Sequence, residues 1–176
     1  MELRRLRVVG NTGSGKTTFA ARAAQRLGVP HLELDAVFWA ADWTKRDPAE
    51  ARGLVRDFVA SSPAGWVADG NWTTHLADAL DDADAIVWLD FPRRTVMPRV
   101  VRRTLRRGLL RTDLWHGNRE NLRNLVRRDP DQNVVLWSWT QHEPYRLRYE
   151  QLAVQSPVPV IRLRSPREAR RWLTAL

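Results

Sequence analysis

The sequence predicts an α/β fold in which a five-stranded parallel sheet is covered by helices on both faces. The first observation is a set of five short apolar runs, rich in β-branched residues. The second is that stretches with helical periodicity separate these runs, so strands and helices alternate along the chain. The third is a glycine-rich turn, Gly10–Thr17, between the first run and the first helical stretch. Such alternation is typical of parallel sheets buried between two helix layers.

The elements follow in order along the chain. The predicted strands are residues 6–9, 31–34, 66–68, 85–89 and 158–163. The predicted helices are residues 17–27, 48–60, 73–80, 93–107, 118–128, 131–152, interrupted at Pro144, and 166–175. Asp47-Pro48 and Ser165-Pro166 open two of them, because a capping side chain before a proline is a helix-start signal. Among the nine tryptophans, Trp66, Trp88 and Trp172 are predicted to be core residues.

The length and composition favour one globular domain, residues 1–176, that is not inserted in a membrane. No stretch approaches the roughly 20 apolar residues that a membrane span needs. The charged start, Met1 to Arg5, lacks the apolar region of a signal peptide. Since the chain has no cysteine, disulfides and thiolate chemistry are excluded. We expect a cytoplasmic protein.

The Gly10–Thr17 segment matches Gly-x4-Gly-Lys-Thr, the phosphate-binding loop of P-loop NTPases. Its glycines allow positive φ and close approach of backbone N–H groups to phosphate oxygens. Lys16 is expected to reach the β- and γ-phosphates, and the Thr17 hydroxyl to bind Mg²⁺. The residues predicted to bind nucleotide here are Gly10, Asn11, Thr12, Gly13, Ser14, Gly15, Lys16, Thr17 and Thr18. A P-loop NTPase sandwich that binds ATP or GTP is therefore predicted.

Three predicted strands end at an aspartate: Asp35, Asp69 and Asp90. The carboxyl ends of parallel strands meet at one edge of the sheet, which is also the edge of the phosphate loop. One or two of these carboxylates near Thr17 would complete a magnesium site. Asp69 is favoured, because Asp69-Gly70-Asn71 makes a tight turn directly after a short buried strand. A turn or capping aspartate is the alternative for each.

The net charge of +9 comes from one segment. Residues 93–128 contain twelve arginines and two acidic residues, so the remainder is nearly balanced. Such a segment suits the phosphates of a small substrate, a nucleic-acid backbone or an acidic partner. Its leucines recur at helical spacing, which favours an amphipathic element over a disordered nucleic-acid arm. Nucleic acid is thus a possible partner, but not the favoured one.

Seven motifs together carry a family resemblance. They are GNTGSGKTT, HLELDAVFW, WVADGNW, VWLDFPRR, RVVRRTLRR, LWHGNRENL and IRLRSPREARRWL. With them, the chain resembles the adenylate kinase-like P-loop kinases nearly end to end. Within that group, it resembles the bacterial proteins labelled DNA topology modulation proteins or adenylate kinase-like ATPases. The resemblance implies an ATP- and Mg²⁺-dependent phosphotransferase.

The resemblance also implies roles for single residues. It makes Asp69 the acid that orients magnesium-bound waters, places Arg99 on the adenine and places Arg103 at the phosphates. Independently, the spacing of four puts both arginines on one helix face. The family's Gly-Phe-Pro-Arg is replaced here by Gly70-Asn71-Trp72-Thr73, which removes a phosphate-binding arginine and argues against AMP as the acceptor.

Two segments receive a function from the resemblance. Residues 36–62 correspond to the acceptor-binding insertion, and about 104–129 to an arginine-rich helical lid. The stretch 115–118 is expected to be the turn between the two lid helices. Asp35 corresponds to the acid that deprotonates the acceptor hydroxyl in the shikimate kinase branch. Trp39, Trp43, Arg52 and Arg56 are candidates to hold a planar or phosphorylated acceptor.

Three functions remain open at this point. The first is a phosphotransferase with an unidentified acceptor, in which Lys16, Asp35 and Arg103 are catalytic. The second is an NTPase or nucleotide-dependent regulator that contacts nucleic acid or protein through the basic segment. The third is a nucleotide-binding protein without turnover. No water-positioning residue is evident in the sequence, which favours the first.

Overall fold

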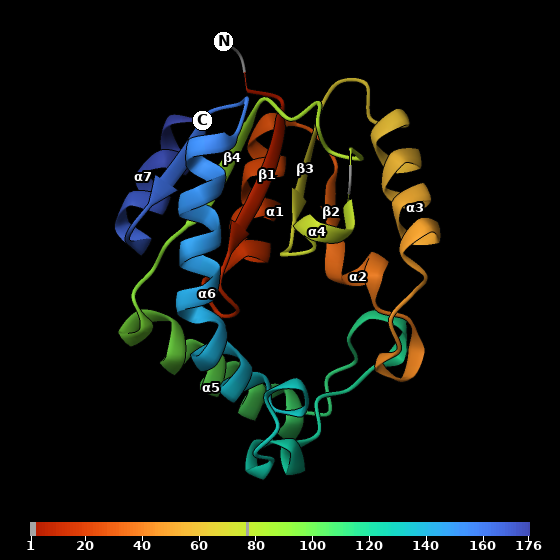
Figure 1. Cartoon of the computed structure of the whole chain (residues 1–176), viewed down its shortest axis with the longest axis vertical. Helices are drawn as coiled ribbons and strands as arrows, with labels where there is room; N and C mark the ends of the chain where they lie inside the picture. The colour runs from red at the N-terminus through yellow and green to blue at the C-terminus, as the bar shows by residue number, and fades with distance from the viewer. Residues whose placement is uncertain (1–2, 77) are drawn as a thin grey trace.

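The computed structural model describes residues 3–76 and 78–176, and within them it contains a five-stranded parallel sheet (Figure 1). The strands are β1 (Arg5–Gly10), β2 (His31–Glu33), β3 (Trp66–Asp69), β4 (Ala85–Leu89) and β5 (Val160–Leu163). They lie in the order β2-β3-β1-β4-β5, and neighbouring strands are parallel. The predicted α/β fold class is confirmed.

Helices connect these strands. They are α1 (Lys16–Leu27), α2 (Leu34–Phe38), α3 (Pro48–Ala60), α4 (Thr73–Leu76), α5 (Arg93–Leu109), α6 (Val134–Gln155) and α7 (Pro166–Ala175). Short 3-10 helices are η1 (Ala41–Trp43), η2 (Trp115–Gly117), η3 (Leu122–Val126) and η4 (Pro130–Gln132). Among the described residues, no helix is long and apolar enough to cross a membrane.

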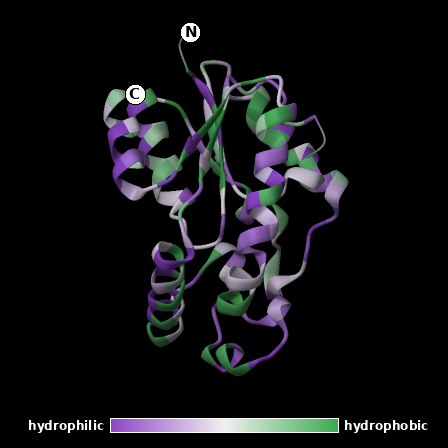
Figure 2. Cartoon of the chain, turned by 60° about the vertical axis from the view of Figure 1, so that its left-hand side comes forward, coloured by the Kyte–Doolittle hydropathy of each residue, from purple (hydrophilic) through white to green (hydrophobic). Residues whose placement is uncertain are grey.

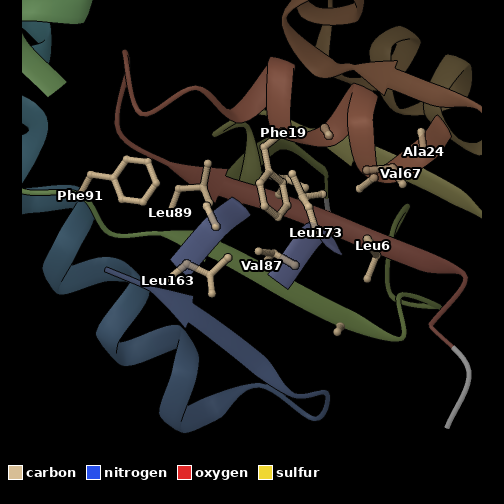
Figure 3. Packing of buried hydrophobic residues seen from close by; sticks show 14 of the residues in the cluster. Leu6, Phe19, Ala24, Val67, Val87, Leu89, Phe91, Leu163 and Leu173 are labelled. Carbon is tan, nitrogen blue, oxygen red and sulfur yellow. The ribbon is translucent and has the colours of Figure 1, made fainter. Parts of the chain in front are cut away.

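Neighbouring residues of the central strands pack against different helix layers. Val8 of β1 belongs to the cluster built with α1 and α7, whereas Val9 packs with Tyr149 of α6. Figure 3 shows the first cluster, where Phe19 and Leu173 lie over the sheet. The strands β3 and β4 are buried along their whole length and are almost continuously apolar, as expected for strands covered on both faces, and much of the sheet is green in Figure 2.

The predicted core tryptophans lie where the strands and helices meet. Trp66 and Trp88 are buried in β3 and β4. Trp172 of α7 is only partly buried and stacks on Phe19 at 5.6 Å between ring centroids. Their packing accounts for three of the nine tryptophans and leaves others available to line a site.

The strand register brings the functional candidates to one edge of the sheet. Val8 of β1 lies beside Asp69, the last residue of β3, and Asp69 lies beside Glu33, the last residue of β2. Gly10, where the phosphate loop begins, lies beside Leu89 at the end of β4. The loop and the acids are therefore neighbours, as the strand-end pattern predicted.

The prediction of a helix at residues 118–128 was wrong. Only η3 forms there, because asparagine side chains bind the backbone in place of helical bonds. The predicted helix 73–80 is shorter, ending at Leu76, and turns follow it. Pro144 was expected to interrupt the last long helix, but α6 continues through it from Val134 to Gln155.

The segment between α5 and α6 crosses beneath the carboxyl edge of the sheet and reaches the segment after α2 (Figure 1). We call residues 104–129 the arginine-rich segment and residues 36–62 the insertion. Asn118 of the arginine-rich segment is buried against the insertion. Its Nδ2 donates to Ala40 O at 2.8 Å, and its Oδ1 accepts from Trp43 N at 2.9 Å. The two segments thus close over the sheet edge.

Candidate active site

The phosphate loop has the conformation that only glycines permit. Gly10, Gly13 and Gly15 have φ of 145°, 85° and 93°. A Cβ on Gly10 would lie 2.7 Å from Leu89 O, and one on Gly13 would overlap Val100. Gly15 also caps α1 without a side chain, so the first N–H groups of that helix face the loop. This is the arrangement that binds phosphate.

A buried network holds the loop against α6. Asn11 donates from Nδ2 to Ser138 O at 2.9 Å, and its Oδ1 accepts from Thr12 N at 2.8 Å. Ser138 Oγ donates to Thr12 O at 2.9 Å. Lys16 Nζ donates to Asn11 O at 3.2 Å. These hydrogen bonds order the loop before any ligand binds, so phosphate binding costs little conformational entropy.

Thr17 and Asp69 form the candidate magnesium site. Thr17 Oγ1 donates to Asp69 Oδ2 at 2.9 Å, and His31 Nε2 lies 2.7 Å from Asp69 Oδ1. A hydroxyl and a carboxylate are the hard oxygen ligands that Mg²⁺ prefers, and it usually keeps several waters. Within the described residues no group of three or more His, Cys, Asp or Glu forms a metal cage. The pair fits magnesium held mostly by phosphate and water.

Asp35 lies across the site from Lys16, in the first turn of α2. Its Oδ1 accepts a hydrogen bond of 2.7 Å from Trp72 Nε1. Burial raises the pKa of Asp35, although the positive charge of Lys16 acts in the opposite direction. Burial likewise lowers the pKa of Lys16, against the opposing charges of Asp35 and Asp69. The carboxylate is thus made more basic beside a cation that could hold phosphate.

Arg99 and Arg103 extend from α5 toward the loop. Arg99 Nη1 donates to Ser14 O at 3.3 Å, and its guanidinium lies 5.7 Å from the Phe91 ring centroid. Burial lowers the pKa of Arg103, and the charge of Arg107 adds to that effect. Arg103 Nε is buried without a hydrogen-bond partner among the described residues. A buried, unpaired guanidinium nitrogen is a position where an anion would be stabilised.

These side chains surround one cavity of about 1650 Å³. Its lining includes Phe19, Pro166 and Leu173 from the side of α1 and α7, the phosphate loop with both arginines, and Asp35 and Trp39 from the side of α2. One face of α6 also lines it through Trp137, Gln141, Tyr145 and Arg148. The volume is larger than a typical small-molecule pocket, so it has room for two ligands side by side.

Six residues from the sequence prediction are not among those that line this cavity: Gly10, Asn11, Asp69, Asp90, Arg52 and Arg56. Asp69 still contacts the cavity wall, through its hydrogen bond with Thr17. Asp90 ends β4 but pairs with Arg162 at 2.6 Å. The expectation that two arginines of α3 face the acceptor was wrong. Arg52 donates to His75 O at 3.4 Å, and Arg56 pairs with Asp78 at 2.6 Å. The way α3 packs against α4 turns both of them away, a tertiary effect that helical spacing does not reveal.

Sequence reasoning missed Glu33, Trp72 and Trp115. Trp115 Nε1 donates to Glu33 Oε2 at 3.0 Å, and burial raises the pKa of Glu33. The signal for Glu33 was its place at a strand end, two residues before Asp35. The α6 face was also missed, although residues 137, 141, 145 and 148 recur at helical spacing.

Comparisons with known proteins agree with this architecture. No family model and no curated protein matches the chain. Among solved structures, a shikimate kinase from Bacteroides thetaiotaomicron has a TM-score of 0.56 at 14% identity, covering 99% of this chain and 96% of that one. A shikimate kinase from Acinetobacter baumannii in complex with shikimate has a TM-score of 0.54 at 18% identity, covering 98% and 90%. The chain is thus similar to these shikimate kinases in fold.

Proposed function

We propose that the protein is an ATP- and Mg²⁺-dependent phosphotransferase that acts on a small hydroxyl-bearing acceptor. One observation carries the proposal. A preformed phosphate loop with Lys16, a basic carboxylate at Asp35 and an unpaired Arg103 surround the same cavity. A phosphate donor, an acceptor base and a charge stabiliser are the parts that phosphoryl transfer requires.

The middle and one end of the cavity would hold ATP. Loop N–H groups and Lys16 bind the phosphates, and Arg99 lies beside the loop at Ser14. The base is expected between Arg99 and the apolar patch of Pro166 and Leu173, which lines the same cavity. Thr17 and Asp69 would hold Mg²⁺, with His31 fixing the Asp69 carboxylate. When bound, Mg²⁺ would neutralise charge on the phosphates of ATP.

Asp35 is proposed as the residue that activates the acceptor. Its free oxygen accepts the acceptor's hydroxyl proton while the hydroxyl oxygen bonds to the γ-phosphorus and the bond to ADP breaks. The raised pKa of Asp35 makes it a stronger base than an exposed aspartate. Lys16 and Arg103 offset the negative charge on the transferring group.

The arginine-rich segment is proposed as a lid over this reaction. Its contacts with the insertion at Asn118, Trp115 and His116, whose Nε2 donates to Ala36 O at 2.8 Å, cover the cavity. Exclusion of water favours transfer to the acceptor over hydrolysis. Arg103 and Arg107, which belong to the twelve arginines of residues 93–128, line the cavity. Part of the positive charge of these residues would therefore stabilise the bound phosphates. We propose the cytoplasm, the site of ATP metabolism, as its compartment.

The proposal is tested by measuring ADP release with Mg-ATP alone and with panels of nucleosides, nucleotides, sugars and small acids. A phosphotransferase releases ADP faster with its acceptor, and Asp35→Asn removes the stimulation. ATP hydrolysis at one rate, whatever acceptor is present, would support the NTPase function instead. ATP binding without any release of ADP would indicate a nucleotide-binding protein without turnover.

A further inference from the structure

The acceptor end of the cavity has an aromatic wall. Trp39 meets Trp72 edge-on at 5.6 Å and Trp43 at 5.8 Å between ring centroids. Phe38 stacks behind Trp72 at 4.5 Å with an interplanar angle of 8°, which fixes the Trp72 ring. Trp115 of the arginine-rich segment adds a further indole to the lining. Such a wall suits the apolar face of a ring.

Two carboxylates face this wall, and each keeps one oxygen free. Glu33 Oε2 accepts from Trp115 Nε1 at 3.0 Å, and Asp35 Oδ1 accepts from Trp72 Nε1 at 2.7 Å. Within the part of the chain that the structure describes, no hydrogen bond reaches Glu33 Oε1 or Asp35 Oδ2. An ionised carboxylate only accepts, so a ligand between these groups must donate at two positions.

Several positive side chains near this end are held by other groups. Lys16 and Arg103 lie toward the phosphate loop, where the γ-phosphate is expected. Arg52 and Arg56, which the sequence assigned to the acceptor, bind His75 O and Asp78 outside the cavity. Lys45 and Arg148 also line the cavity and lie 6.0 Å and 5.6 Å from the ring centroids of Trp39 and Tyr145.

The arginine-rich segment also pairs its own arginines near this end. Arg107 binds Glu120 at 3.1 Å, and Arg119 binds Asp113. Each of these guanidinium groups is thus already paired with an acid. An anionic acceptor would have to lie beside the free carboxylate oxygens of Glu33 and Asp35, which repel it, so a donor without negative charge fits this end better.

We propose that this end of the cavity selects a ring-shaped polyhydroxy compound that is uncharged or carries an ammonium group, and rejects acceptors with a carboxylate or phosphate. One hydroxyl donates to Asp35 and receives the phosphoryl group. A second donor, hydroxyl or ammonium, binds Glu33, and the ring lies on the tryptophan wall. This inference rests on the proposed function and specifies its acceptor.

The test uses matched compounds that share a ring and differ in charge. Glucose, glucosamine and glucuronate form one set, nucleosides and their monophosphates a second, and shikimate, a hydroxylated carboxylate, is added. ADP release with saturating Mg-ATP reports transfer, and quenching of tryptophan fluorescence reports binding. Neutral or cationic members should raise ADP release at least about 10-fold over their anionic counterparts, the factor expected for one lost hydrogen bond to a charged group plus charge repulsion.

Single substitutions test what Glu33 and the tryptophan wall contribute to acceptor binding. Glu33→Gln should raise the KM for the acceptor about 10-fold or more, and most for ammonium compounds, while leaving the KM for ATP near wild type. Glu50→Gln is the matched control, because Glu50 is exposed and pairs with Arg46 outside the cavity. Trp39→Leu should raise the same KM, whereas Trp139→Leu, at a half-exposed position outside the cavity, should not.

The outcomes distinguish failure of the proposed acceptor class from failure of the proposed phosphotransferase function. Transfer to anionic members alone, or a raised acceptor KM in Arg52→Ala, would overturn the inference and leave the phosphotransferase standing. Failure of every class to bind or to accept phosphate, with ATP still bound, would also overturn it. Acceptor-independent hydrolysis, or no ATP binding, would instead remove the proposed function.

Discussion

The Thr17 hydroxyl donates a hydrogen bond of 2.9 Å to Asp69 Oδ2, which joins the end of the phosphate loop to the end of β3. His31 contacts the second oxygen of the same carboxylate at 2.7 Å. The buried Asp69 side chain is therefore fixed at both oxygens before any ligand enters. If this pair binds Mg²⁺ as proposed, the Asp69 side chain would lose little conformational entropy on binding the ion.

Asp69→Asn should affect turnover more than nucleotide binding. The amide keeps the shape of the side chain but removes the charge that is assigned to Mg²⁺, so kcat should fall on the order of 100-fold. The Kd for ATP should change far less, because loop N–H groups and Lys16 hold the phosphates. Steady-state kinetics and ATP titration check both. Asp90→Asn is the control, because Asp90 also follows a strand but pairs with Arg162 instead of Thr17. Equal losses in the two variants would argue against the assignment.

Asp35→Asn should abolish the acid limb of the pH–rate profile together with most of the transfer rate. A general base works only when deprotonated, and burial raises the pKa of Asp35 above its ordinary value near 3.8. The wild-type rate should therefore fall with decreasing pH at a pH above that value. A wild-type rate that stays flat down to pH 4 would contradict a basic role for Asp35.

The raised pKa of Asp35 also makes the stability of the fold depend on pH. The folded protein binds more protons than the unfolded chain between the ordinary and the raised pKa, so this group's contribution to stability falls as pH rises through that window. Asp35→Asn stays neutral throughout, so the difference in melting temperature between variant and wild type should move in favour of the variant as pH rises from about 4 through the raised pKa of Asp35. Thermal melts at several pH values measure this; a constant difference would contradict it.

Asn118→Ala should open the contact between the arginine-rich segment and the insertion. The side chain makes one hydrogen bond to each of Ala40 and Trp43, and both are lost. We expect the acceptor KM to rise about 10-fold and acceptor-independent ATP hydrolysis to increase, because water enters an uncovered site. Val126→Ala, at an exposed position of the same segment outside the cavity, serves as the control. An unchanged ratio of transfer to hydrolysis would exclude a lid role.

Arg103→Ala should reduce transfer by about 100-fold or more, the typical loss for a group that stabilises transition-state charge. The alternative is that the basic segment neutralises a DNA backbone. DNA affinity would then fall steeply with salt, with a slope near −0.9 for each phosphate contacted, and DNA would stimulate ATP hydrolysis. DNA affinity and ATPase rate, measured between low and physiological salt, should show neither effect.

The sheet and the phosphate loop could be predicted because their signals are local. Five apolar runs and one glycine pattern specify the strands and the loop, and strand ends bring Asp35 and Asp69 to the same edge. The arginine-rich segment could not be predicted in detail. Asn133, for example, donates from Nδ2 to Leu125 O at 3.0 Å and to Arg127 O at 2.9 Å, and these side-chain bonds use carbonyls that a continuing helix would need.

The acceptor wall depended on tertiary packing. Trp72 follows β3 and Trp115 lies more than forty residues later, yet they bind the neighbouring acids Asp35 and Glu33. Their pairing requires the arginine-rich segment to cross the sheet edge, which no periodicity encodes. Pro144 is another case, because packing along α6 outweighs the one backbone hydrogen bond that proline removes.

The most direct test follows the γ-phosphate itself. ATP labelled at the γ-position is incubated with Mg²⁺, the protein and a stimulating acceptor, and labelled organic product and inorganic phosphate are separated. The phosphotransferase predicts label mainly on the organic product, lost in Asp35→Asn, and lost together with ATP binding in Lys16→Ala. Label that appears only as inorganic phosphate, at the same rate with and without acceptor, would contradict it.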